Sequence, residues 1–226
     1  MKKRFLQATS MTVLFKGFIY WILKIFVGIQ YADCSFLKKE KQFILIANHN
    51  SHLDTLSLMS SLPSELLPKV KPVAAEDYFG NTKLKAALSN YFFNTLLINR
   101  KGNTGKENSA LDKMLQALDD GYSLLLFPEG TRGEPEQMGK LKSGIARLLV
   151  QRPNIKYVPV FLAGMGRSLP KGEMIILPYN ANMHFGEPSV ACSSDPHEVM
   201  EQIENEFHTM MEKFRIKDDD EEDEEE

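Results

Sequence analysis

The sequence holds only two cysteines, Cys34 and Cys192, which lie far apart and in no metal-binding spacing. This cysteine usage is typical of a reduced, cytoplasmic protein and gives no indication of a zinc site or a catalytic cysteine. The chain also lacks a G-x-S-x-G motif, so it has no nucleophile elbow to expose a catalytic serine. Gly164-Met165-Gly166 lacks the third glycine of a dinucleotide-binding fingerprint. We therefore expect neither a covalent serine or cysteine mechanism nor a bound cofactor.

Charge is distributed unevenly along the chain. The formal net charge is −3, but residues 218–226 are all acidic, so residues 1–217 carry +6. A basic body suits an anionic membrane surface or a phosphorylated ligand. The run of like charges predicts a disordered tail over residues 217–226. We favour a solvated, solubilising tail over an electrostatic shield that competes with anionic lipid or substrate.

Residues 11–31 are strongly apolar and follow the cations Lys2-Lys3-Arg4. A signal peptide would need a small-residue cleavage site, and residues 30–34 supply a poor one. The length fits a membrane span, but Lys16 and Lys24 interrupt it. On a helix the polar residues share one face; they are Thr12, Lys16, Tyr20, Lys24 and Gln30. We favour an amphipathic helix lying in the membrane interface over a spanning helix or a soluble core helix.

Apolar runs alternate with helical patterns over the rest of the chain. Strands are predicted at 42–47, 72–75, 95–98, 122–127, 156–163, 173–177 and 183–186. Helices are predicted at 51–62, 78–89, 106–120, 141–152 and 195–214. The alternation predicts an α/β fold with a mostly parallel, mixed central sheet flanked by helices, and the closeness of the last two strands predicts an antiparallel part. We expect one domain over 32–216 after a membrane-associating segment 1–31, and Pro159 indicates a bulge or an edge strand.

The stretch Asn48–Asp54 carries the most chemical information. His49 follows a predicted buried strand, and Asp54 falls about one turn into the next helix. An imidazole can act as a general base near neutral pH, and a neighbouring carboxylate can hold its tautomer. With no nucleophilic side chain available, the activated hydroxyl would belong to the substrate. A metal site at His49, His52 and Asp54 is disfavoured because His-x-x-His is not the usual helical spacing; we interpret His52 as a rim or packing residue.

Further charged groups follow other predicted strands. Phe127-Pro128-Glu129-Gly130-Thr131-Arg132 ends one strand, at the edge where α/β sheets bind ligands. Glu129 could accept a hydrogen bond from a hydroxyl, and Arg132 could bind a phosphate. Arg100 ends another strand, and Lys142 lies at a helix start whose N–H groups favour anions. Each signal is weak alone, but together they predict a site for a phosphorylated substrate.

Taken in order, four segments resemble the glycerolipid acyltransferase family, whose best-known members are lysophosphatidate acyltransferases. They are Asn48-His49-x4-Asp54, Ile98-Asn99-Arg100, Phe127–Arg132 and Val158-Pro159-Val160. The resemblance covers residues 43–164, and the first and third segments together are highly specific. The sequence departs from the family at 94–100, where a glycine often lies upstream of Phe-Ile-x-Arg, and at 141–144, where Phe-Lys-x-Gly is common. These departures concern the acceptor rather than the chemistry.

The resemblance implies transfer of a fatty acyl group from acyl-CoA or acyl-carrier protein to the free hydroxyl of a lysophospholipid in phospholipid biosynthesis. The leading acceptor is 1-acyl-sn-glycerol-3-phosphate, which would give phosphatidate. The alternatives are another lyso-lipid acceptor and a non-enzymatic lipid-binding module. The protein would be associated with the cytoplasmic face of a membrane, the inner one if it is bacterial.

The resemblance also implies residue roles. His49 would be the base and Asp54 its partner, and the Val-Pro-Val segment would help to shape the acyl side. The acceptor site would be lined by Arg100, Glu129, Gly130 and Arg132, and we add Thr131 and Lys142 as predicted substrate-binding residues. Backbone N–H groups in the His49 and Glu129-Gly130 turns are candidate donors to the oxyanion.

Overall fold

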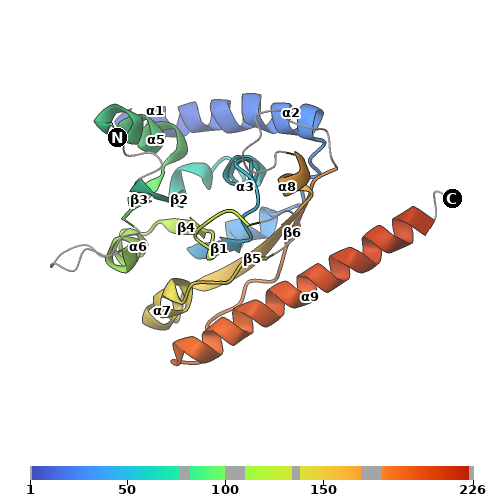
Figure 1. The fold of residues 1–226 in the computed structure, drawn as a ribbon. Coiled ribbons are helices and arrows are strands. Elements are labelled where there is room, and N and C mark those ends of the chain that lie inside the picture. The colour runs from blue at the N-terminus through green and yellow to red at the C-terminus, as the bar shows by residue number, and fades with distance from the viewer. Residues whose placement is uncertain (1, 77–81, 100–109, 134–137, 169–179, 224–226) are drawn as a thin grey trace.

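A six-stranded sheet forms the centre of the protein (Figure 1). The computed structural model describes residues 2–76, 82–99, 110–133, 138–168 and 180–223. The strand order is β3-β2-β4-β1-β5-β6, with β6 antiparallel to β5 and every other pair parallel. The strands are β1 (Phe43–Ala47), β2 (Val70–Ala75), β3 (Leu96–Ile98), β4 (Ser123–Leu126), β5 (Lys156–Ala163) and β6 (Asn182–Phe185). The mixed, mostly parallel sheet is thereby confirmed, and the strand predicted at 173–177 lies outside the described residues.

Helices cover both faces of this sheet. Because successive side chains of a strand point to opposite faces, Phe43 and Leu45 join one hydrophobic cluster and Ile44 and Ile46 join the other. The first cluster lies beneath α3 (Asp54–Ser61) and the N-terminal segment, and the second beneath three further helices. These are α6 (Ala110–Asp119), α7 (Gly144–Gln151) and α9 (Pro196–Asp223). The other elements are η3 (Ser35–Lys39), η4 (Leu67–Lys69), α5 (Lys83–Phe93) and α8 (Met165–Ser168).

Of the two alternatives expected at Pro159, a bulge or an edge strand, the edge strand is wrong, because β5 lies inside the sheet between β1 and β6. The backbone N and O atoms of Pro159 face the neighbouring strand β6 just beyond its last residue, Phe185. Gly186 N–H donates to the carbonyl of Pro159 at 2.8 Å, and the next contact is the isolated bridge between Tyr157 and Ser189. The missing N–H of the proline therefore falls at an existing gap in the ladder, which makes it tolerable in an interior strand.

The segments α1 (Lys2–Thr12), η1 (Val13–Ile19), α2 (Tyr20–Ile22) and η2 (Leu23–Val27) form one continuous helix, called here the N-terminal helix. Every fourth residue from Met11 to Val27 faces the domain; these residues are Met11, Phe15, Ile19, Leu23 and Val27. A spacing of four drifts around an α-helix with 3.6 residues per turn. The two π segments hold more residues in each turn, so the five side chains stay on one face.

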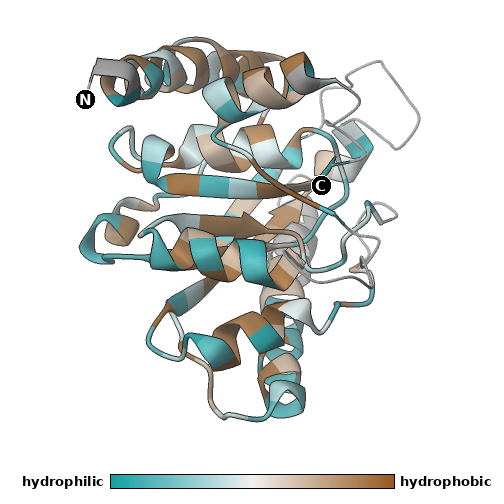
Figure 2. Ribbon diagram, turned by 90° about the vertical axis from the view of Figure 1, so that its left-hand side faces the viewer, coloured by the Kyte–Doolittle hydropathy of each residue, from teal (hydrophilic) through white to brown (hydrophobic). Residues whose placement is uncertain are grey.

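The outward face of the N-terminal helix carries many apolar side chains, and the orientation of its polar face was not predicted. Lys16 turns inward and donates a hydrogen bond to the carbonyl of Ser60, near the C-terminus of α3. The helix from Arg4 to Val27 is long and apolar enough to cross a membrane, and it lies along the domain (Figures 1 and 2). Eight large hydrophobic side chains on it are exposed, namely Phe5, Leu6, Val13, Phe18, Trp21, Ile22, Ile25 and Phe26.

Two of the predicted helices end four or more residues before the helices in the structure do. The helix predicted at 78–89 is described only from Lys83, at α5, and continues to Phe93. Helix α9 extends to Asp223, well into the acidic run for which disorder was predicted from residue 217. Extending an existing helix costs far less than nucleating one, so the helix continues past Lys217 although the three aspartates that follow have a low intrinsic helix propensity.

Candidate active site

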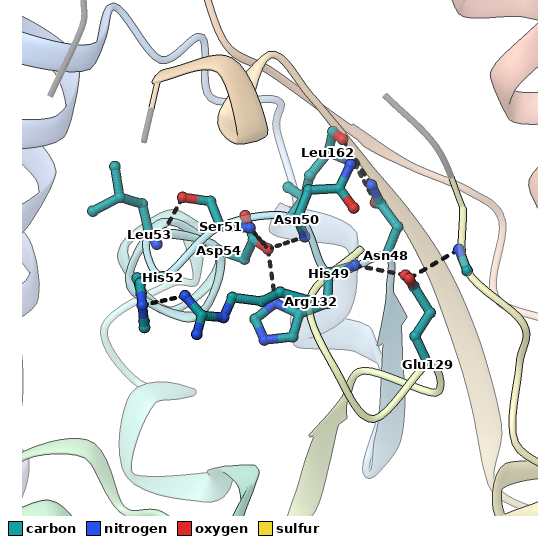
Figure 3. A network of polar contacts seen from close by, with 11 residues as sticks. Asn48, His49, Asn50, Ser51, His52, Leu53, Asp54, Glu129, Arg132 and Leu162 are labelled. Carbon is teal, nitrogen blue, oxygen red and sulfur yellow. Dashed lines mark hydrogen bonds and ion pairs between the residues drawn. The ribbon is translucent and has the colours of Figure 1, made fainter. Parts of the chain in front are cut away.

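Two neighbouring parallel strands bring the first and third sequence motifs together. Strand β1 leads into the turn 48–53, and β4 leads into the loop 127–133. Leu45 pairs with Leu125 in register, so both segments leave the same edge of the sheet. The predicted meeting of the two motifs at the C-terminal ends of these strands is therefore observed (Figure 3).

The His49 imidazole and the Asp54 carboxylate form a close pair. Nδ1 of His49 lies 2.8 Å from Oδ2 of Asp54, and the Asp54 side chain is fully buried whereas that of His49 is 21% exposed. The same Oδ2 accepts hydrogen bonds from the backbone N–H groups of Asn50 and Ser51, each at 2.8 Å. An ionised carboxylate can only accept, so Nδ1 carries the proton of the neutral ring and Nε2 keeps its lone pair. The geometry suits a general base that works through Nε2.

The backbone of His49 is held from both sides by the loop after β4. Its N–H donates to Oε1 of Glu129 at 2.8 Å, and its carbonyl accepts from the N–H of Gly133 at 2.8 Å. The imidazole stacks on the ring of Phe127, with 4.2 Å between ring centroids. The loop therefore positions the proposed base directly, which its sequence alone did not reveal.

Asn48 fixes the start of the same turn. Its side-chain amide donates to the carbonyl of Leu162 at 2.8 Å, and its side-chain oxygen accepts from the Leu162 N–H at 2.7 Å. Leu162 belongs to β5, so the turn is tied to both strands that flank β1. Asn48 was part of the motif, but no role was predicted for it.

Glu129 is almost fully buried, and both oxygens of its carboxylate bind backbone groups. Oε1 accepts from His49, and Oε2 accepts from the N–H of Gly139 at 2.9 Å. Burial raises the pKa of this carboxyl, and the two backbone hydrogen bonds partly oppose that rise. Gly139 must lack a side chain here, since a Cβ would lie 2.6 Å from Oε2. Glu129 thus braces two loops, and its contact with an acceptor hydroxyl stays a prediction.

Arg132 reaches from the loop to the side chain of His52, and its guanidinium contacts Nε2 of that ring. Burial is the main cause that lowers the pKa of His52, followed by the positive charge of Arg132 and the nearby His49. His52 therefore acts as a neutral acceptor that holds the guanidinium on this side of the site. The sequence interpretation of His52 as a rim or packing residue missed this contact.

The remaining predicted substrate-binding residues lie around the same loop. Gly130 has a φ of +70°, and a Cβ there would lie 2.5 Å from Nζ of Lys142, so the lysine amine rests against the glycine. The backbone N–H of Lys142 also donates to Pro128 at 2.9 Å. Thr131 is exposed, and Arg100 lies outside the described residues. Loop 127–133 and Lys142 are therefore brought together, whereas the place of Arg100 is not described.

Some predicted oxyanion donors are already engaged. The N–H of His49 binds Glu129, and the N–H of Gly130 donates to the carbonyl of Phe127 at 3.0 Å. Neither group is free to stabilise a developing negative charge in this conformation. Within the described residues, no group of three or more His, Cys, Asp or Glu side chains could hold a metal ion.

Comparison with known proteins fits this geometry. Residues 28–163, more than half of the chain, match the model of the acyltransferase family. The chain belongs to this family. A relative from Homo sapiens, 1-acyl-sn-glycerol-3-phosphate acyltransferase alpha, is 26% identical over 174 residues, which are 76% of this chain and 59% of that protein. A relative from Mycoplasma pneumoniae, a probable 1-acyl-sn-glycerol-3-phosphate acyltransferase, is 26% identical over 151 residues, or 65% of this chain and 55% of that protein.

The fold of this acyltransferase-family chain is also found in a solved structure. The 1-acyl-sn-glycerophosphate acyltransferase PlsC from Thermotoga maritima aligns with a TM-score of 0.74 and 19% identity, covering 94% of this chain and 81% of that one. The two chains therefore share their fold. The present chain spans about six tenths of the length of the human relative.

Replacement of Glu129 tests its bracing role. In Glu129→Gln one acceptor oxygen becomes an NH2 group, which faces the N–H of either His49 or Gly139. One buried donor is then unpaired, which should lower the free energy of unfolding by about 1–3 kcal/mol in urea denaturation. The exposed Glu187→Gln should change it by less than about 0.5 kcal/mol. Equal stability of the two variants would refute the bracing role.

The lowered pKa of His52 predicts a pH dependence of stability. Below its ordinary pKa of 6.5 the unfolded chain binds a proton at His52 before the folded protein does. The free energy of unfolding should therefore fall as the pH is lowered through the window just below 6.5. Urea denaturation across this window should show a smaller fall in the free energy of unfolding for His52→Gln than for the wild-type protein. An unchanged slope in His52→Gln would contradict the assignment.

Proposed function

We propose that the protein is an O-acyltransferase that moves a fatty acyl group from a thioester to the free hydroxyl of a lysophospholipid. The observation that carries this proposal is the orientation of His49, whose Nδ1 is held by buried Asp54 while Nε2 keeps its lone pair. Family membership, with the matched relatives named as acyltransferases, supports the same chemistry.

In the proposed mechanism Nε2 of His49 removes the proton of the acceptor hydroxyl as its oxygen attacks the thioester carbonyl. The resulting tetrahedral intermediate collapses, the carbon–sulfur bond breaks, and the imidazolium returns the proton to the departing thiolate. Asp54 holds the ring in place and stabilises its positive charge between the two steps. No acyl-enzyme forms, so both substrates bind together and their positioning supplies much of the rate.

We propose 1-acyl-sn-glycerol-3-phosphate as the acceptor and phosphatidate as the product. Arg132 and Lys142 lie on the loop that holds His49 or against it, and an arginine fork or a lysine amine suits a phosphate. The donor would be acyl-CoA or acyl-carrier protein. The relatives' names support this acceptor, while another lyso-lipid would use the same catalytic pair.

We infer that the reaction takes place at the cytoplasmic surface of a membrane. The N-terminal helix is packed on the domain through one face and presents apolar side chains on the other, as expected of a helix that lies in the interface. Trp21 and Tyr20 on this helix contact the ammonium of Lys24, each at 5.8 Å from the ring centroid. Aromatic rings beside a long cationic side chain suit the level of the lipid headgroups.

An acyl-transfer assay tests the proposal. Radiolabelled acyl-CoA and acyl-carrier protein are each offered a panel of phosphorylated and other lyso-lipid acceptors. His49→Ala should lower kcat by at least about 10²–10⁴-fold with the fold intact, because it removes the general base. Asp54→Asn should also be severe, while the exposed His197→Ala should retain wild-type turnover. Near-normal turnover by a folded His49→Ala variant would refute the mechanism. If the wild-type protein transfers no acyl group to any acceptor, a lipid-binding module is favoured instead.

A further inference from the structure

Exposed hydrophobic side chains are concentrated on two helices. Among the described residues twelve large hydrophobic side chains are exposed, and eleven of them belong to the N-terminal helix or to α5. Leu84, Leu88 and Phe92 of α5 are 69%, 47% and 36% exposed. They are spaced four residues apart and share one face of the helix. The twelfth, Val190, lies elsewhere in the chain.

The two helices form one continuous surface. The side-chain amide of Gln7 donates to the carbonyls of Asn90 at 3.0 Å and Tyr91 at 3.2 Å. On the inner side, Phe15 packs edge-to-face against Phe93 of α5. On the outer side, an open groove of about 410 Å³ lies between the helices. Its apolar lining comes from both of them, as Leu6, Val13, Leu14, Phe18 and Phe92.

The charged residues of these two helices have a single sign. The N-terminal helix has three cationic residues in α1 and one in each π segment, and α5 has two. Neither helix contains an aspartate or a glutamate, although the chain has 30 acidic residues. Arg4, Lys24 and Lys85 are exposed. An apolar face with exposed cations and no anions complements a bilayer whose headgroups are anionic.

We propose that α5 is a second membrane-binding element and that, together with the N-terminal helix, it docks on an anionic lipid bilayer. Leu84, Leu88 and Phe92 enter the boundary between headgroups and acyl chains beside Leu6, Val13 and Phe18. With two contacting helices the domain cannot roll about the axis of the N-terminal helix, so its orientation on the membrane is fixed. The inference rests on the membrane location proposed above and is independent of the chemistry at His49.

Vesicle binding tests the contribution of α5. The double variant Leu84→Gln/Leu88→Gln should bind vesicles of phosphatidylcholine and phosphatidylglycerol at least about tenfold more weakly than wild type, because two exposed apolar side chains no longer enter the lipid. Val190→Gln, a matched change outside the surface, should bind like wild type. If the double variant binds vesicles as tightly as wild type does, the proposal is overturned. It is also overturned if the wild-type protein is a dimer that the two substitutions dissociate, because the surface would then join two copies of the chain.

Fluorescence quenching reports on the membrane contact of each helix separately. Trp21 is the only tryptophan, so its quenching by lipids brominated on the acyl chains reports the N-terminal helix. In Trp21→Phe/Leu88→Trp the same measurement reports α5, and comparable quenching is expected. Quenching of Trp21 without quenching at residue 88 would overturn the role of α5 alone, and quenching of neither would overturn the membrane location as well. Turnover of a water-soluble short-chain acceptor by the double variant should equal wild type and keeps the test separate from the catalytic proposal.

Discussion

A single oxygen, Oδ2 of Asp54, accepts hydrogen bonds from the His49 ring and from the N–H groups of Asn50 and Ser51. It lies at the first residue of α3, where the helix dipole favours a negative charge. The path of the turn, the start of the helix and the tautomer of the imidazole therefore depend on the same buried carboxylate. Protonation of Asp54 or its replacement by a neutral residue would weaken all three at once, because hydrogen bonds to a neutral oxygen are weaker than those to a carboxylate.

The sheet topology explains why two distant motifs act as one unit. Strand β1 lies between β4 and β5, so the His49 turn has a loop on one side and the end of a strand on the other. Glu129 and Gly133 hold it from the loop, and Leu162 holds it through Asn48. Helix α3 then connects this turn to the N-terminal helix, since Lys16 binds the carbonyl of Ser60 near its far end. The proposed base, the sheet and the proposed membrane helix thus form one packed assembly.

Local sequence patterns predicted those features that depend on local physics. Buried parallel strands appear as continuous apolar runs, so β1 and β4 were found from Phe43–Ala47 and Ser123–Leu126. The pairing of His49 with Asp54 follows from their spacing across one turn. The buried brace at Glu129 did not follow, because its partners, His49 and Gly139, are set by the approach of two loops.

The same reasoning explains the differences elsewhere. An angle of 100° per residue placed Lys16 on a shared polar face but did not reveal which neighbour that face meets, and in the structure Lys16 donates to the carbonyl of Ser60 near the end of α3. A proline within a strand pattern suggested a bulge or an edge strand. The gap in the ladder that accommodates Pro159, between Gly186 and Ser189, depends on tertiary contacts and could not be predicted from the local sequence. These contacts join segments that are far apart in the sequence, so no local sequence pattern predicts them.

The central claim is that Asp54 and the loop after β4 hold His49 with its proton on Nδ1 and its lone pair on Nε2. Nitrogen NMR of histidine-labelled protein, with the His49 signals assigned from their loss in His49→Gln, tests it most directly. At a pH where the ring is neutral, the account predicts a single tautomer with a protonated Nδ1 and an unprotonated Nε2, and loss of that preference in Asp54→Asn. A proton on Nε2, or rapid exchange between both tautomers in the wild-type protein, would contradict it.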